Sequence, residues 1–151
     1  MSKFFQAFLT GLFFTFFLDF FLFLGIFEHY IRFYEIELYY NVLFADHQNI
    51  FIYLILTIII GFLVTYVHNK KISLTMFIVL FLISLSFLIP SVGYSIGKLM
   101  LMTQKVTLKD AKYTYNGDIY YNGRNKITFY DKEIDKIIIL NKKDLKNETY
   151  Q

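Results

Sequence analysis

The 151-residue chain contains no cysteine, a single proline and few charged residues. Without cysteine it can form neither disulfides nor thiolate metal or redox sites. Charged residues make up 18%, hydrophobic residues 56% and aromatic residues 21%, and the mean hydropathy is +0.47. Typical soluble domains carry roughly 25% charged residues. Because a soluble chain of this size cannot bury three long apolar runs, the composition predicts a membrane protein.

The sequence also lacks the motifs of common catalytic sites. It contains no G-x-S-x-G, no H-E-x-x-H and no glycine-rich phosphate loop. Glu28–His29 and Asp46–His47 offer metal donors, but a metal site needs three or four donors that converge. The net charge of +3 is too small and too scattered to indicate a nucleic-acid partner. We therefore expect no enzyme, cofactor, metal or nucleic acid, although partner subunits could complete a catalytic site.

Three apolar runs, about residues 4–27, 50–67 and 72–97, are long enough to predict transmembrane helices. The first has 24 residues and would form a helix about 36 Å long, enough to cross a hydrocarbon core of roughly 30 Å. It is too long for the apolar region of a cleaved secretory signal, and the charged Glu28 follows it. The third run contains Pro90, which we expect to kink or end the helix.

Residues 28–49 connect the first two runs and mix acidic with aromatic side chains, which predicts a segment at the membrane interface. A short basic connection at 68–71 joins the second and third runs. Together with Lys3, its lysines predict a cytoplasmic N-terminus and a periplasmic C-terminal domain. The bias towards Phe, Ile, Lys, Asn and Tyr is typical of a bacterium, so we expect the chain in a bacterial inner membrane. The basic residues that count against this orientation are Arg32, Lys98, Lys105, Lys109 and Lys112.

Residues 104–151 change to the two-residue periodicity of strands and predict a small antiparallel β domain. The dipeptide Asn116–Gly117 predicts a tight hairpin between 112–115 and 118–121, because its turn type needs positive φ. A meander of short strands predicts a curled sheet or an SH3- or Sm-like barrel, too small to be stable without docking. The other expected elements are strands at 106–108, 126–130 and 134–140, turns at 122–125 and 131–133, and a frayed tail at 141–151.

Asp19 is the only charged residue inside the first apolar run. It lies within about 5 Å of the middle of that run, where a carboxylate costs roughly 2.5–3.5 kcal/mol to insert. It must therefore face protein, water or a cation, or be protonated. Either it forms a buried hydrogen bond or salt bridge with another subunit and fixes an assembly, or it lines a proton or ion pathway. We favour assembly, because the other two runs carry no acid or histidine for a relay.

Small residues recur at four-residue spacing on the predicted spans, which allows helix backbones to approach closely. Such stripes predict helix contacts within the chain or with partners. The residues are Ala7, Gly11 and Thr15 on the first span, Thr57, Gly61 and Thr65 on the second, and Gly93 and Gly97 on the third.

These features predict an α-helical, multi-pass accessory or scaffold subunit of a larger inner-membrane complex. Its partners would be the lipid bilayer and other membrane-protein subunits, including copies of itself. The helices would dock through the small-residue stripes and the β domain through a sheet edge. The alternative is a small homo-oligomeric channel or ion-translocating subunit that uses Asp19.

Overall fold

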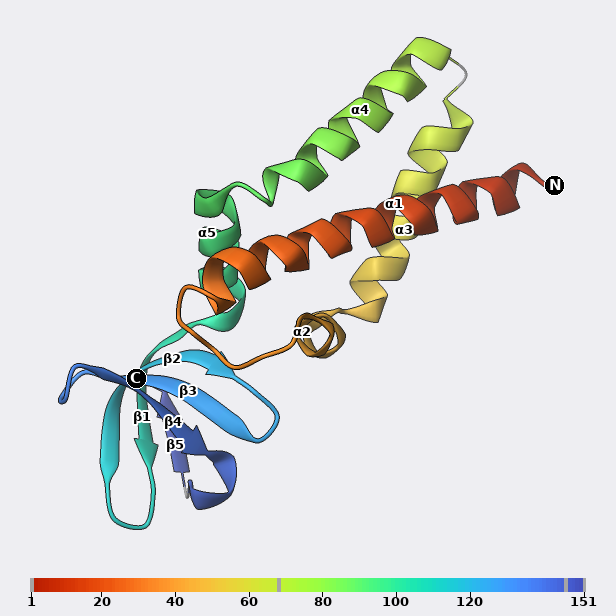
Figure 1. Cartoon of the computed structure of the whole chain (residues 1–151). Coiled ribbons are helices and arrows are strands. Elements are labelled where there is room, and N and C mark those ends of the chain that lie inside the picture. Colours follow the sequence, from red (N-terminus) through yellow and green to blue (C-terminus); the bar gives the residue numbers. More distant parts are fainter. Residues whose placement is uncertain (1, 68, 146, 151) are drawn as a thin grey trace.

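The computed structural model describes residues 2–67, 69–145 and 147–150 of the chain. A group of α-helices precedes an antiparallel sheet, and the two occupy opposite ends of the molecule (Figure 1). The α-helical region and the C-terminal β domain expected from the sequence are therefore present. The helices are α1 (Lys3–Ile26), α2 (Tyr40–His47), α3 (Ile50–Tyr66), α4 (Lys70–Ser86) and α5 (Pro90–Leu101), and a π-helical turn, η1 (Phe27–Ile31), extends α1.

Only one helix of the described chain is by itself long and apolar enough to cross a membrane. It consists of α1 and η1 together, the 29 residues Lys3–Ile31. Two further candidate spans are long and apolar enough only when two helices are taken together. These pairs are bent by 83° (α2 with α3) and by 76° (α4 with α5). The expected third span, 72–97, is therefore not one helix. It divides because α4 ends at Ser86 and Pro90 begins α5, a position where a residue without an N–H is tolerated.

Asparagine side chains mark where two of the apolar helices begin. The side chain of Asn49 accepts hydrogen bonds from the backbone N–H groups of Phe51 and Ile52. Asn69 accepts in the same way from the backbone N–H of Lys71 at the start of α4. Such caps satisfy donors that the first turn of a helix leaves free. Polar residues thus fix the starts of α3 and α4, and the apolar runs fill the helices.

α3 runs antiparallel to α1, whereas α4 lies alongside α1 and runs parallel to it (Figure 1). Along the first pair, Gly11 lies against Thr57 and the earlier residue Ala7 lies against the later residue Gly61. Along the second pair, the ring contacts are Phe14 with Phe77 and Phe17 with Phe81. The start of α1, the end of α3 and the start of α4 therefore meet at the end of the molecule opposite the sheet.

The sheet is antiparallel, with strand order β4-β3-β2-β1-β5, so β1 to β4 form a meander and β5 returns beside β1. Residues on one face of adjacent strands supply its core. The core residues are Val106, Leu108, Ile119, Ile127 and Phe129, each at most 1% exposed. The strands are β1 (Thr103–Lys109), β2 (Thr114–Asn122), β3 (Lys126–Asp131), β4 (Lys136–Asn141) and β5 (Asn147–Tyr150).

The hairpin predicted at Asn116–Gly117 is wrong. β2 continues through both residues, and the turn between β1 and β2 lies earlier, where the Asp110 carboxylate accepts from the backbone N–H of Tyr113 at 3.1 Å. A Cβ on Gly117 would lie 1.8 Å from the carbonyl oxygen of Tyr130 on β3. This glycine therefore permits a close approach of two strands, and no described glycine has a positive φ.

The other β elements lie near their expected positions. The backbone N–H of Gly123 donates to the carbonyl oxygen of Lys126 at 3.0 Å and closes the turn between β2 and β3. β1, β3 and β4 overlap the three remaining expected strands. The tail, expected to fray, returns to the sheet instead in its described residues 141–145 and 147–150; residues 146 and 151 lie outside the described part. A 3₁₀ turn, η2 (Lys142–Asp144), leads into β5, whose backbone pairs with β1.

Candidate functional site

The small-residue stripes of α1 and α3 pack against each other. Ala7, Gly11, Thr15, Thr57 and Gly61 are all buried. A Cβ on Gly11 would lie 1.8 Å from the carbonyl oxygen of Thr57, and a Cβ on Gly61 would lie 2.1 Å from that of Ala7. The two helix backbones are therefore in direct contact at this crossing, which larger residues would prevent.

Thr15 and Thr57 contribute to the contact between α1 and α3 by their small size. The buried hydroxyls of Thr15 and Thr57 have no hydrogen-bond partner within the described chain. Thr65, the last residue of the α3 stripe, lies outside the contact and lines a cavity together with Lys3. Since the remaining stripe residues are buried between α1 and α3, they serve a contact within one chain and are not accessible to a partner.

A second set of small residues holds α5 against the end of α1. A Cβ on Gly93 would lie 2.6 Å from the carbonyl oxygen of Gly25, and a Cβ on Gly97 would lie 2.5 Å from the Cβ of Tyr30. A Cβ on Gly25 would lie 2.1 Å from the carbonyl oxygen of Phe87. Gly25 lies outside the four-residue spacing of the α1 stripe, so spacing alone does not reveal its role.

Asp19 has a hydrogen-bond partner in its own chain. Nε2 of Gln48, at the break between α2 and α3, donates to Oδ2 of Asp19 at 3.1 Å. Asp19 is therefore level with the start of α3, and it helps to fasten the α2–α3 turn to α1. Sequence spacing does not reveal Gln48, because it lies in a connection. Two tyrosine hydroxyls beside this contact donate to carbonyl oxygens of α1: Tyr40 to Phe20 (3.0 Å) and Tyr53 to Leu12 (3.1 Å).

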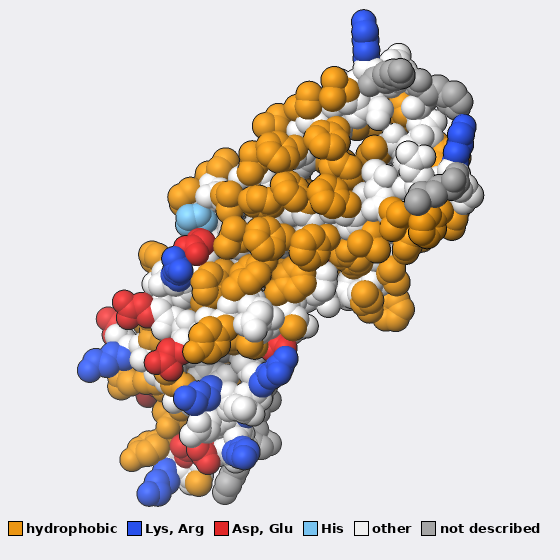
Figure 2. Space-filling view, turned by 45° about the vertical axis from the view of Figure 1, so that its right-hand side comes forward, with side chains coloured by type: hydrophobic (Ala, Val, Ile, Leu, Met, Phe, Trp, Pro, Cys, Tyr) orange, Lys and Arg blue, Asp and Glu red, His pale blue; other side chains and the backbone are white. Residues whose placement is uncertain are grey.

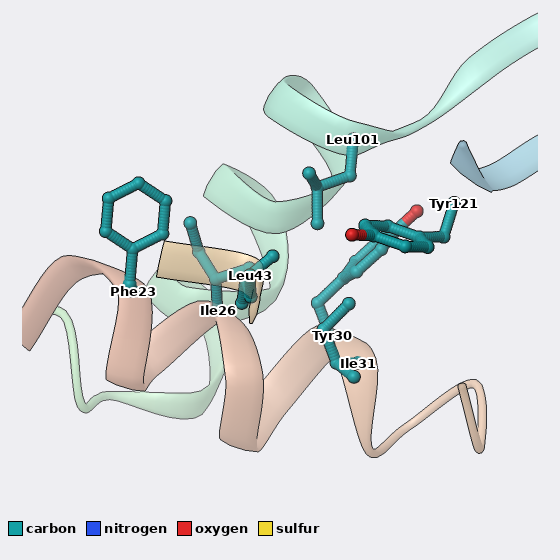
Figure 3. Close-up of a cluster of buried hydrophobic side chains, with 7 residues drawn as sticks. All are labelled: Phe23, Ile26, Tyr30, Ile31, Leu43, Leu101 and Tyr121. Carbon is teal, nitrogen blue, oxygen red and sulfur yellow. The ribbon is translucent and has the colours of Figure 1, made fainter. Parts of the chain in front are cut away.

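A cluster of buried side chains joins the helices to the sheet (Figure 3). Its members come from α1, η1, α2, α5 and β2 and point towards one another. Residues 28–49, expected to form an interfacial segment, thus also supply part of a core. This junction cluster consists of Phe23, Ile26, Tyr30, Ile31, Leu43, Leu101 and Tyr121.

Tyrosine hydroxyls add directed contacts at the junction cluster. Tyr30 is fully buried and donates its hydroxyl to the carbonyl oxygen of Tyr120 on β2 at 2.8 Å. The hydroxyl oxygens of Tyr34 and Tyr94 lie 2.7 Å apart. The ring centroids of Tyr34 and Tyr120 are 4.0 Å apart. The segment after α1 is therefore fixed to both β2 and α5.

Polar contacts hold the periphery of the junction. Nε of Arg124, in the turn between β2 and β3, lies 2.9 and 3.0 Å from the two carboxylate oxygens of Asp46 on α2. The hydrogen bond from this guanidinium holds the pKa of Asp46 below its usual range. Nε2 of His29 donates to the carbonyl oxygen of Leu88, between α4 and α5, at 2.9 Å. Along the chain only Met102 separates α5 from β1.

The acidic residues considered as metal donors pair with arginines. Glu28 forms an ion pair with Arg32, and Asp46 forms one with Arg124. Within the described residues no group of three or more His, Asp or Glu side chains is placed to hold a metal ion.

The surface divides into an apolar and a charged part (Figure 2). On the face shown, hydrophobic side chains cover the helical region, and charged side chains gather around the sheet. A soluble monomer rarely exposes so continuous an apolar surface. Side chains that are more than half exposed on the three apolar helices include Phe13 on α1, Phe51 and Ile55 on α3, and Leu74 and Leu82 on α4.

β4, at an edge of the sheet, carries exposed apolar side chains, and one of them, Ile139, lines a cavity with Tyr121 and Arg124. Ile137 and Ile139 are 46% and 55% exposed. One side of β4 pairs with β3, and no described strand pairs with its other side. A free edge with exposed apolar side chains is suited to accept a further strand.

Comparisons of the chain with models of protein families, with curated proteins and with solved structures find no match. The function must therefore be argued from the contacts and surfaces of the chain itself. The features that bear on it are the apolar helices, the junction cluster and the free edge of β4.

Proposed function

We propose that the chain is a non-enzymatic accessory or scaffold subunit of a larger bacterial inner-membrane complex. The observation that carries this proposal is the junction cluster. It fixes a small β domain with an exposed apolar edge to helices with an apolar surface. A domain attached in this way keeps a constant height and orientation over a membrane, which is what the positioning of a partner requires.

In this proposal α1, α3 and α4 cross the bilayer. α3 and α4 have 17 residues each, which gives helices of about 25 Å, at the short end of the range for transmembrane segments. η1, α2 and α5 lie at the interface beside the sheet, because they carry Glu28, Asp46 and Lys98. Three crossings put Lys3 on the side opposite the sheet, and the lysines at this end favour the cytoplasm.

The β domain would present β4 to the partner. The strand order, with β5 returning beside β1, supports a curled sheet of the SH3- or Sm-like kind. Curling leaves β4 as an edge at which a strand of another subunit would cover Ile137 and Ile139.

The proposal is tested by site-specific photo-crosslinking of the full chain in bacterial membranes. A photoreactive residue at Ile139 should crosslink to a different membrane protein. The same residue at Tyr113, which is 64% exposed in the turn between β1 and β2, is the matched control and should not. Crosslinks only between copies of the chain would favour a homo-oligomer, and no crosslink at Ile139 would contradict the proposed role of β4.

The alternative, a channel that uses Asp19, makes a different prediction. Because Asp19 hydrogen-bonds to Gln48, we expect Asp19→Asn to keep the α2–α3 turn in place and to leave ion and proton flux in liposomes at the wild-type level. Gln48→Leu should instead loosen this turn, which hydrogen exchange in α2 would detect. A flux that the wild type supports and Asp19→Asn abolishes, with the fold intact, would establish the channel.

A further inference from the structure

A cavity of about 480 Å³ opens at the end of the helical region farthest from the sheet. It lies where α1 and α4 begin and α3 ends, and it is separate from the junction cluster and from β4. Its polar lining comes from Lys3, Gln6 and Thr10 on α1, Thr65 on α3 and Ser73 on α4. Side chains from all three proposed spans thus converge on one polar space at one surface of the proposed membrane region.

The charge around this cavity is entirely positive. The sequence has no aspartate or glutamate in residues 1–18 or 47–109, whereas Lys3 lines the cavity and Lys71 lies in the first turn of α4, the helix that supplies Ser73. Lys3 and Lys71 belong to none of the three ion pairs in the described chain. The described residues therefore supply no acidic partner for Lys3 at this end of the molecule.

The hydrogen-bond donors of the cavity are also available. The side chains of Gln6, Thr10 and Thr65 make no hydrogen bond with another described residue, and only the hydroxyl of Ser73 is engaged, by donating to the carbonyl oxygen of Val64 at 3.2 Å. A cation with several hydroxyl and amide donors matches a phosphate group, which carries negative charge and several acceptor oxygens.

The apolar part of the lining indicates where that phosphate comes from. Leu74 and Phe77 line the same cavity and are 61% and 45% exposed, so the cavity continues onto an apolar helix surface. A ligand that fills both parts has an anionic head and a hydrocarbon tail. Basic pockets between transmembrane helices bind anionic lipid headgroups in this manner.

We propose that this cavity binds the phosphate headgroup of an anionic phospholipid, with Lys3 paired to the phosphate and the acyl chains along α4. The proposal rests on the proposed membrane location of the helices. It does not depend on the identity of any protein partner, and it assigns to this end of the chain a lipid contact that fixes its depth in the bilayer.

The test is native mass spectrometry of the full chain, with a C-terminal tag, in a neutral detergent with added phosphatidylglycerol or phosphatidylcholine. We expect the wild type to retain phosphatidylglycerol in preference to phosphatidylcholine. Lys3→Gln should reduce its occupancy about fivefold, the effect of one lysine near an anionic headgroup. Lys98→Gln makes the same charge change at an exposed side chain of α5, far from the cavity, and should leave the occupancy unchanged. Thr10→Val keeps the side-chain volume and should also reduce occupancy, at an unchanged thermal midpoint.

Equal retention of the two lipids, or an equal loss in Lys3→Gln and Lys98→Gln, would overturn the site. Inorganic phosphate at millimolar concentration should not displace the lipid. If inorganic phosphate alone bound with the same dependence on Lys3, the phosphate group in the cavity would not be that of a lipid, and the proposal would be wrong. Failure of this site would leave crosslinks at Ile139 unchanged, and absence of those crosslinks would leave lipid binding unchanged, so the two proposals fail separately.

Discussion

The contact between α1 and α3 and the junction between the helices and the sheet hold the molecule together by different means. At the first, Gly11 and Gly61 let two backbones touch, and the buried threonine hydroxyls have no described partner. At the second, Tyr30 donates a hydrogen bond and Arg124 pairs with a carboxylate. The difference follows from the surroundings. Among apolar side chains close packing is the main source of stability, beside the hydrogen bond from Tyr53 to Leu12, whereas near polar surface more directed bonds are added.

The sharpest way to break the helix contact is Gly11→Ala. The added Cβ would lie 1.8 Å from a backbone oxygen of α3, and a backbone cannot move aside as a side-chain tip does. We expect a loss of about 3 kcal/mol in the free energy of unfolding, at the upper end of the range for overpacking. Thermal unfolding in detergent, followed by circular dichroism, measures it. Leu9→Ala on the exposed face of α1 is the control, and an equal loss there would contradict the packing argument.

The helix contact is also the part of the fold that the sequence reveals best. The four-residue spacing of small residues indicates a close contact of helices, and the structure pairs the stripe of α1 with that of α3. Spacing does not tell whether the second surface belongs to the same chain. The glycine at position 117 shows the opposite case. Asn116–Gly117 has the composition of a turn, but the partner strand decides its role, because the carbonyl of Tyr130 needs the space.

The junction should respond less to a single change, and Tyr30→Phe tests this. The substitution keeps the ring in the junction cluster and removes the hydroxyl that donates to Tyr120. We expect a loss of about 1 kcal/mol, the usual net value of one hydrogen bond. Hydrogen exchange should rise at β2 and remain unchanged along α3. Tyr113→Phe, at an exposed hydroxyl, is the control; increased exchange in α3 but not in β2 would refute the role assigned to Tyr30.

The junction itself is harder to predict from sequence. Residues 28–49 are rich in both acids and aromatic residues, which indicates a segment at the membrane interface. Nothing in their spacing indicates that Leu43 is buried in the same cluster as Tyr121. Contacts between segments so distant in the chain depend on how the helices bend. The partner of Asp19 has the same origin, since Gln48 reaches it only because the chain turns between α2 and α3.

The smallest effect should come from the ion pair at the edge of the junction. The hydrogen bond from Arg124 lowers the pKa of Asp46 in the folded chain, so the stabilising contribution of the pair is present above the pKa of the unfolded chain and is lost as the pH falls through the lowered pKa. The drop in thermal midpoint between about pH 6 and about pH 2.5 should therefore be smaller in Arg124→Gln than in the wild type. Added salt screens the two charges, so it should also reduce the difference in thermal midpoint between the wild type and Arg124→Gln. Lys143→Gln, an exposed cation, serves as control and should keep the wild-type drop; identical drops in all three proteins would rule out the pair.

The single residue between α5 and β1 has a mechanical consequence. With only Met102 between them, the helix and the sheet turn together as a lever. A pull on β4 would pass through α5 to α1 and η1, because Gly93 and Gly97 of α5 lie against Gly25 and Tyr30. At the bend before Pro90, His29 holds the carbonyl of Leu88. The sheet, α5 and the end of α1 would therefore move as one body, and a load on the sheet would be carried by the longest of the described helices.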